Sequence, residues 1–152
     1  MKIKNVFLLV GSILNFCAAA IHLATALVPQ WSAIFSGGDF LVPNPRLLQA
    51  ASLVVMILCT IWAFYGLSGA GLIRRLPLLR LGIFLIGAIY VPYGLLIIFR
   101  ELGLVSSLPS SGMMNLPSWL VTFGALTAGI LYWLGLAVGW KQLGRKPIPT
   151  HV

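Results

Sequence analysis

Few side chains in this sequence could do chemistry, and most of them lie within or beside long apolar segments. His22 is the only imidazole, carboxyl or cationic group well inside such a segment. An ionisable group within a membrane needs compensation, and such groups commonly mark functional sites. Four polar side chains from two later segments could meet it there: Gln49, Tyr93, Arg100 and Glu101. We therefore predict that these five residues form a ligand-binding site.

Each of these residues also has a purely structural interpretation. His22 could be neutral and hydrogen-bonded to Gln49, to Tyr93 or to a backbone carbonyl. Arg100 and Glu101 could simply form a solvated helix end. Other polar and sulfur-containing residues within the apolar segments are expected to join or pack helices: Asn15, Tyr90, Tyr132, Cys17 and Cys59.

The familiar catalytic and metal-binding motifs do not occur in the sequence. There is no GxGxxG, GxxxxGK[ST], HExxH or GxSxG, and neither CxxC nor HxxxH spacing. The two acidic residues, Asp39 and Glu101, lie in a predicted loop and at a predicted helix end, which argues against paired-carboxylate chemistry. We predict no metal site, and the sequence identifies no cofactor.

The composition indicates an integral membrane protein. Of 152 residues, 60% are hydrophobic and 8% are charged, whereas soluble domains carry about 25% charged residues. The net charge of +8 is compatible with nucleic acid or with a lipid surface. Because the basic residues lie at the edges of apolar segments, we predict contact with lipid and no nucleic-acid partner.

The predicted fold is all-α, a single membrane domain over residues 1–152 with four transmembrane helices. The apolar segments are about residues 6–28, 47–67, 81–99 and 118–140, and each approaches the roughly 20 residues that a membrane span needs. The first segment also resembles a secretory signal peptide. It continues beyond the usual apolar length of about 7–15 residues, so we predict a retained helix.

The connection between the second and third segments is expected to define the topology. Ser68-Gly69-Ala70-Gly71 is predicted to break the helix, and Arg74, Arg75 and Arg80 follow. The positive-inside rule then places this loop and both termini in the cytoplasm, as for a multi-pass protein of a bacterial inner membrane. The same three arginines are predicted to contact lipid headgroups. Further basic residues fall on this side: Lys2, Lys4, Lys141, Arg145 and Lys146.

Each apolar segment carries a stripe of small or polar residues at helical spacing. Lipid offers no hydrogen bonds, so these stripes should turn toward one another and allow close packing. We therefore predict a compact four-helix bundle. The stripes are Ser12, Asn15, Ala19, His22 and Ala26; Gln49, Ser52, Met56, Cys59, Ala63 and Gly66; Ile83, Gly87, Tyr90 and Gly94, with Glu101 beyond; and Ala125, Ala128, Tyr132, Gly135 and Gly139.

One segment resembles a recurring pattern in small, uncharacterised bacterial four-helix integral membrane proteins. It is YGLSGAGLIRRLPLLRLG at residues 65–82, with AIY at 88–90. The resemblance covers about residues 18–99 and includes His22-Leu23 and Arg46-Leu47. In those proteins a basic residue follows the Ile-Tyr pair, whereas Val91 follows it here. The general plan also resembles DoxX-like membrane proteins in helix count and size. The resemblance implies a four-helix fold and transfers no functional residue.

Three functions are compatible with these features. The first is a non-enzymatic accessory or assembly subunit, or a binder of a hydrophobic ligand such as a quinone or lipid. The second is a small oligomeric transporter or channel subunit. The third is a membrane enzyme that uses His22 as an acid or base. The expected partners are the lipid bilayer and either other membrane proteins or further copies of the chain.

Overall fold

The computed structural model describes residues 5–31, 44–104 and 116–143, and these residues form helices and short connections only. The elements are α1 (Val6–Leu27), the short 3-10 helix η1 (Pro29–Trp31), α3 (Pro45–Ala70), α4 (Leu79–Glu101) and α5 (Leu116–Leu143). Four of the helices are long and apolar enough to cross a membrane. The predicted all-α, four-helix architecture is therefore confirmed.

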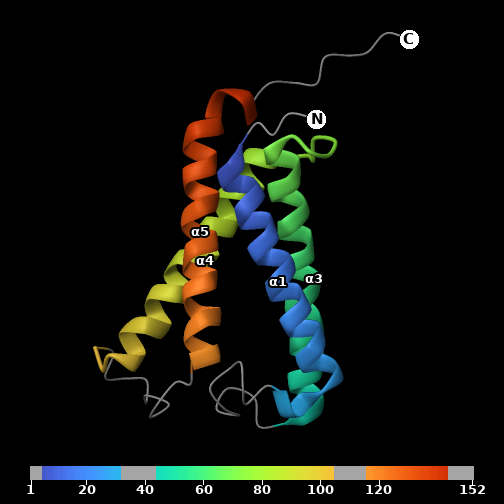
Figure 1. The fold of residues 1–152 in the computed structure, drawn as a ribbon, viewed down its shortest axis with the longest axis vertical. Helices are drawn as coiled ribbons and strands as arrows, with labels where there is room; N and C mark the ends of the chain where they lie inside the picture. Colours follow the sequence, from blue (N-terminus) through green and yellow to red (C-terminus); the bar gives the residue numbers. More distant parts are fainter. Residues whose placement is uncertain (1–4, 32–43, 105–115, 144–152) are drawn as a thin grey trace.

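The four long helices alternate in direction along the bundle (Figure 1). One end of the bundle carries Asn5, the α3–α4 connection at residues 71–78, and Leu143, and we call it the basic end. The other end carries Leu27, Asn44, Glu101 and Leu116, and we call it the far end. The two ends therefore correspond to the two membrane faces that the sequence predicts.

The boundaries of α3 follow from its capping residues. Asn44 accepts a hydrogen bond from the Arg46 backbone N–H at 3.0 Å, and Pro45 occupies the first turn, where no N–H is needed. The helix ends at Gly71, which has a positive φ of 80° that glycine adopts without a Cβ clash. Ser68-Gly69-Ala70 is thus helical, and the chain leaves the helix at Gly71, later than the predicted break.

Two of the other helices also extend past their predicted ends. α4 and α5 include two or three residues beyond the ranges 81–99 and 118–140 at each end, while α1 stops one residue short of 28. Arg80, Arg100 and Glu101 consequently lie within the end turns of α4. Charged residues can lie there because the long side chains reach the membrane surface from a helix end.

The bundle consists of two antiparallel helix pairs, α1 with α3 and α4 with α5. The pairs pack closely in the half near the basic end, where glycines admit large side chains. Leu8 lies against Gly135, and the Tyr132 ring lies against Gly11. Toward the far end the two pairs separate, as the ribbon shows (Figure 1). The molecule is therefore closed in one half and divided in the other.

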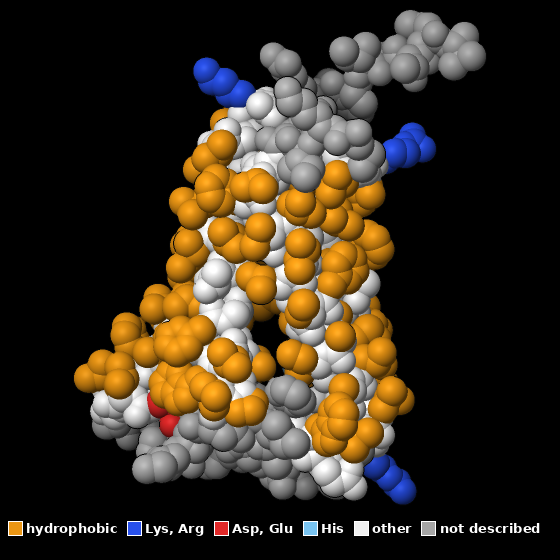
Figure 2. Space-filling model, viewed as in Figure 1, with side chains coloured by type: hydrophobic (Ala, Val, Ile, Leu, Met, Phe, Trp, Pro, Cys, Tyr) orange, Lys and Arg blue, Asp and Glu red, His pale blue; other side chains and the backbone are white. Residues whose placement is uncertain are grey.

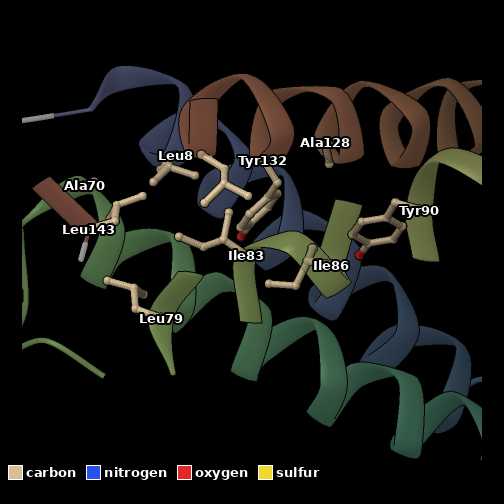
Figure 3. Packing of buried hydrophobic residues seen from close by; sticks show 10 residues of the cluster. Leu8, Ala70, Leu79, Ile83, Ile86, Tyr90, Ala128, Tyr132 and Leu143 are labelled. Atoms are coloured by element: carbon tan, nitrogen blue, oxygen red, sulfur yellow. The ribbon is translucent and has the colours of Figure 1, made fainter. Parts of the chain in front are cut away.

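The main apolar core lies where the pairs converge. In Figure 3, Tyr132 and Tyr90 reach into the space between the helices alongside Leu8, Ile83 and Ile86. Every residue of the predicted small and polar stripes is buried or half-buried, which confirms the predicted inward faces. The outer surface is a belt of hydrophobic side chains with Lys and Arg at its two ends (Figure 2). This distribution is the one that a bilayer requires.

The close approach at Gly66 provides a test of this packing. A Cβ at this position would lie 2.1 Å from Ser12 Oγ and 2.7 Å from the Tyr132 hydroxyl. We expect Gly66→Ala to lower the free energy of unfolding by about 1–3 kcal/mol, the usual cost of overpacking a core. Thermal unfolding in detergent micelles measures this loss.

Gly124→Ala is the matched control. A Cβ at Gly124 would meet nothing within 4 Å, so this substitution should leave the melting temperature unchanged or slightly raised. Equal melting temperatures for the two variants would contradict the helix arrangement at Gly66.

Candidate functional site

A chain of hydrogen bonds crosses the middle of the bundle and joins all four long helices. The Tyr90 hydroxyl donates to Asn15 Oδ1 at 2.6 Å, and Asn15 Nδ2 donates to the Tyr132 hydroxyl at 3.1 Å. The Tyr132 hydroxyl in turn donates to the Trp62 carbonyl at 2.7 Å. At the other end, Cys59 Sγ lies 3.4 Å from the Tyr90 hydroxyl. We call these five residues the polar chain.

The direction of each bond follows from the number of protons available. Tyr90 has one hydroxyl proton and gives it to Asn15, so the Cys59 thiol must be the donor to the Tyr90 oxygen. The second N–H of Asn15 is accepted by the Gly11 carbonyl at 3.1 Å. The side-chain donors of Asn15, Cys59, Tyr90 and Tyr132 are therefore all used within the protein, and these bonds hold the four helices in one arrangement.

Burial makes these bonds necessary. Tyr132 is 0% exposed, Asn15 1% and Cys59 2%. No water is available at this depth in a membrane, so a polar group here must find a partner in the protein. The predicted roles of Asn15 in joining helices and of Tyr90 and Tyr132 in core packing are confirmed. The two cysteines are free, and Cys17 lies exposed on the outer surface while Cys59 is buried.

Sequence reasoning treated these residues separately and missed their connection. A signal for it exists, because each lies near the middle of its own helix: Asn15 in Val6–Leu27, Cys59 in Pro45–Ala70, Tyr90 in Leu79–Glu101 and Tyr132 in Leu116–Leu143. Antiparallel spans of similar length place their midpoints at one depth. Four polar side chains at one depth are therefore positioned to bond to one another.

An opening separates the two helix pairs beyond the polar chain, toward the far end. Figure 2 shows it between the α4–α5 side and the α1–α3 side of the molecule. The hydrogen bonds that join the pairs through Asn5, Asn15, Tyr90 and Tyr132 lie at the depth of the polar chain or nearer the basic end. The described hydrogen bonds between the pairs therefore lie at the middle of the bundle and in its basic-end half.

His22 lies on the same face of α1 as Asn15, the residue that bonds to α4 and α5. It follows Asn15 by seven residues, which places it on the same face of α1 about 10 Å farther along the axis. On α5, Ala125 stands in the same relation to Tyr132 and offers only a methyl group. His22 is half-buried, and none of the hydrogen bonds or ion pairs between described residues involves it. The described residues therefore leave the hydrogen-bonding capacity of its imidazole unused.

The other predicted site residues are placed separately. Gln49 is half-buried near the far end of α3, and Tyr93 is 49% exposed on α4. Within the described part of the chain, no hydrogen bond joins either of them to His22. Arg100 and Glu101 form an ion pair with each other at 2.5 Å in the last turn of α4, which leans away from α1 at the far end (Figure 1). That all five residues form one site stays a prediction.

The three predicted headgroup residues lie at or beside the start of α4, at the basic end. Arg74 is exposed and Arg75 is half-buried in the α3–α4 connection. Arg80 packs across to α5, where its guanidinium lies 4.4 Å from the centre of the Trp140 ring. The three arginines therefore lie together at one end of the bundle, and their contact with lipid headgroups stays a prediction.

Comparison with protein-family models, with curated proteins and with solved structures gives no match. Among residues 5–31, 44–104 and 116–143, no three His, Cys, Asp or Glu side chains gather to hold a metal ion. An inference about function therefore starts from two features of the bundle, the polar chain and the opening beside it.

Tyr90→Phe tests the energetic role of the polar chain. The substitution leaves Asn15 Oδ1 and the Cys59 thiol without their shared partner. We expect a loss of about 0.6–1.7 kcal/mol in the free energy of unfolding, the range measured for hydrogen bonds between membrane helices. Unfolding in mixed micelles with increasing denaturing detergent measures it.

Tyr93→Phe serves as the control, because it removes the same atom three residues away. The Tyr93 side chain is half-exposed, and none of the described residues bonds to its hydroxyl, so stability should not change. If Tyr90→Phe were as stable as Tyr93→Phe, the polar chain would not be holding the helices together.

Proposed function

We propose that this protein is a multi-pass membrane protein that binds a lipid-soluble ligand between its two helix pairs. The observations that support the proposal are the opening between the two helix pairs (Figure 2) and His22, which lies on the same face of α1 as Asn15 and bonds to none of the described residues. A ligand with an apolar body and one hydrogen-bonding group, such as a quinone or a lipid, matches such a space. Sites between the helices of a bundle are common places for such ligands.

The distribution of partners favours His22 as the polar contact for the ligand. The side-chain donors of Asn15, Cys59, Tyr90 and Tyr132 are all used within the protein, whereas none of the described residues bonds to His22. A histidine inside a membrane span costs free energy when its ring nitrogens have no hydrogen-bond partner. A ligand that accepts or donates a hydrogen bond at the ring offsets this cost. On α5, Ala125 stands in the same relation to Tyr132 as His22 does to Asn15 on α1, and its side chain is a single methyl group.

The same features favour binding over catalysis. A general base must be oriented by a second group within hydrogen-bond reach, and the described residues supply none to His22. An accessory or assembly subunit that carries a hydrophobic ligand needs no such partner. We therefore propose the non-enzymatic class over a membrane enzyme.

We further propose that the basic end faces the cytoplasm of a bacterial cell, in its inner membrane. Arg74, Arg75, Arg80 and Lys141 lie at this end, and the positive-inside rule follows Lys and Arg near the ends of the spans. At the far end, the charge of Arg100 is paired with Glu101. Other residues used in the topology prediction lie outside the described residues: Lys2, Lys4, Asp39, Arg145 and Lys146.

His22→Ala tests the ligand site. Native mass spectrometry of gently solubilised wild-type protein should show an added small-molecule mass, and the variant should lose it because the polar contact is gone. His151→Ala is the matched control, since it makes the same change at the other histidine of the chain and should retain the ligand. Wild type without a bound molecule, or a ligand retained in His22→Ala, would contradict the proposal.

Ala125→Phe tests the same site by a different route. The larger ring should fill the opening and exclude the ligand while leaving His22 in place. Ligand binding and the unfolding temperature of Ala125→Phe are both measured. If the variant is folded and binds the ligand as well as wild type does, the assigned position of the ligand is wrong.

Fusions of reporter proteins test the orientation. Green fluorescent protein fused to the C-terminus of this chain should fluoresce, and alkaline phosphatase at the same position should be inactive, because the basic end remains in the cytoplasm. Insertion of the same two reporters between residues 36 and 40, after α1, should give the opposite pattern. Reversed patterns would contradict the orientation and leave the ligand proposal standing.

A further inference from the structure

A second candidate binding site lies on the outer flank of the bundle at the basic end. A groove of about 300 Å³ is lined by Arg80, Leu81 and Phe84 of α4 and by Trp140 of α5. Leu81, Phe84 and Trp140 are each 50–52% exposed, so the groove opens on the lipid-facing surface. It is far from the opening between the helix pairs, and it adds a site that the proposed function does not use.

Arg80 brings unused hydrogen-bonding capacity to this groove. Its Nη2 donates to the Trp140 carbonyl at 2.5 Å, and its guanidinium lies over the Trp140 ring. Its Nε is shielded from solvent and has no hydrogen-bond partner among the described residues. A guanidinium carries five N–H donors; with one on the Trp140 carbonyl and Nε shielded, the three that remain belong to Nη1 and Nη2. Phosphate oxygens are the acceptors that match this planar fork best.

The wall of the groove is held in place from behind. The Phe84 ring stacks on the Trp133 ring with centroids 6.5 Å apart and an interplanar angle of 24°. Trp133 Nε1 donates to the Phe84 carbonyl at 3.2 Å, and Gly87 provides the space for the indole. A wall fixed in this way loses little conformational entropy when an acyl chain packs against it.

Charge and depth indicate which lipid fits. Arg80 is the second residue of α4, so its guanidinium lies at the level of the membrane boundary, where headgroup phosphates are found. Arg74 and Lys141 are exposed at the same end, whereas the one carboxylate among the described residues, Glu101, lies at the far end. No described acidic group could pair with the ammonium of a zwitterionic headgroup here.

We propose that this groove is a binding site for an anionic phospholipid of the adjacent leaflet. The headgroup phosphate accepts hydrogen bonds from Arg80, and the start of an acyl chain packs on Leu81, Phe84 and Trp140. Because Arg80 also bonds to the end of α5, the bound lipid fastens the start of α4 to the end of α5.

The test compares lipid binding by native mass spectrometry and by lipid-dependent thermal stabilisation in detergent. Phosphatidylglycerol should bind wild-type protein more tightly than phosphatidylcholine, and Arg80→Gln should weaken phosphatidylglycerol binding about tenfold, as expected for one charge-assisted hydrogen bond. Lys141→Gln also removes one positive charge at the same end, at an exposed position that does not line the groove. It should leave the affinity within about twofold of wild type, the small effect usual for exposed charges.

Three results would overturn the proposal. Equal losses in Lys141→Gln and Arg80→Gln would show diffuse attraction to anionic lipid instead of a site. Equal binding of the two lipids would show that the phosphate charge is not selected. Displacement of the lipid by inorganic phosphate alone would show an anion site without an acyl-chain groove.

A second variant separates binding from folding, because Arg80→Gln also removes the bond to the Trp140 carbonyl. Leu81→Trp keeps Arg80 and fills the groove from its exposed side, so phosphatidylglycerol binding should fall while the lipid-free melting temperature stays near that of wild type. Undiminished lipid binding in Leu81→Trp would also overturn the proposal.

Discussion

The absence of water at the centre of a membrane constrains this structure more than any other factor. Every long helix carries a hydrogen-bonding side chain near its midpoint, and none of these groups could be satisfied by lipid. The polar chain gives each of these groups a hydrogen-bond partner in one connected set, from the Cys59 thiol to the Trp62 carbonyl. Because Asn15 both accepts from α4 and donates to α5, a rotation of α1 would break two bonds at once. The chain therefore fixes helix rotation as well as helix proximity.

The helices pack closely near the basic end and the two pairs separate near the far end, and both features follow from where the glycines lie along the helices. Glycines near the basic end, such as Gly66 and Gly69 on α3, let side chains of other helices approach the backbone. Nearer the far end, the closest glycine contacts lie within the α4–α5 pair, where Gly94 meets Leu126. The small residues thus join all helices in one half of the bundle and only partners within a pair in the other half. The opening that could receive a ligand follows from this asymmetry.

Much of the fold was accessible from the sequence because hydrophobic length and helical spacing are local properties. The four spans and their buried stripes, including Asn15, Tyr90 and Tyr132, were predicted on that basis. The separation of the pairs was not, because it depends on which glycine meets which side chain, as Gly135 meets Leu8 across 127 positions. The site residues His22 and Tyr93 were predicted to converge, yet their distance depends on the tilt of α4, which no residue spacing encodes. The contact of Arg80 with Trp140 could not be predicted from the sequence either, because it depends on the rotation of α5.

The divergence of the helix pairs also gives the described helices a tapered outline. They occupy a smaller cross-section at the basic end than at the far end (Figure 1). A tapered body in a bilayer displaces unequal numbers of lipid molecules from the two leaflets, and so it couples to the lateral pressure profile and to membrane curvature. Curving the membrane toward one side would favour a wider separation of the pairs, and curving it toward the other would favour their closure. The shape of the surrounding bilayer thereby becomes a mechanical input to this bundle.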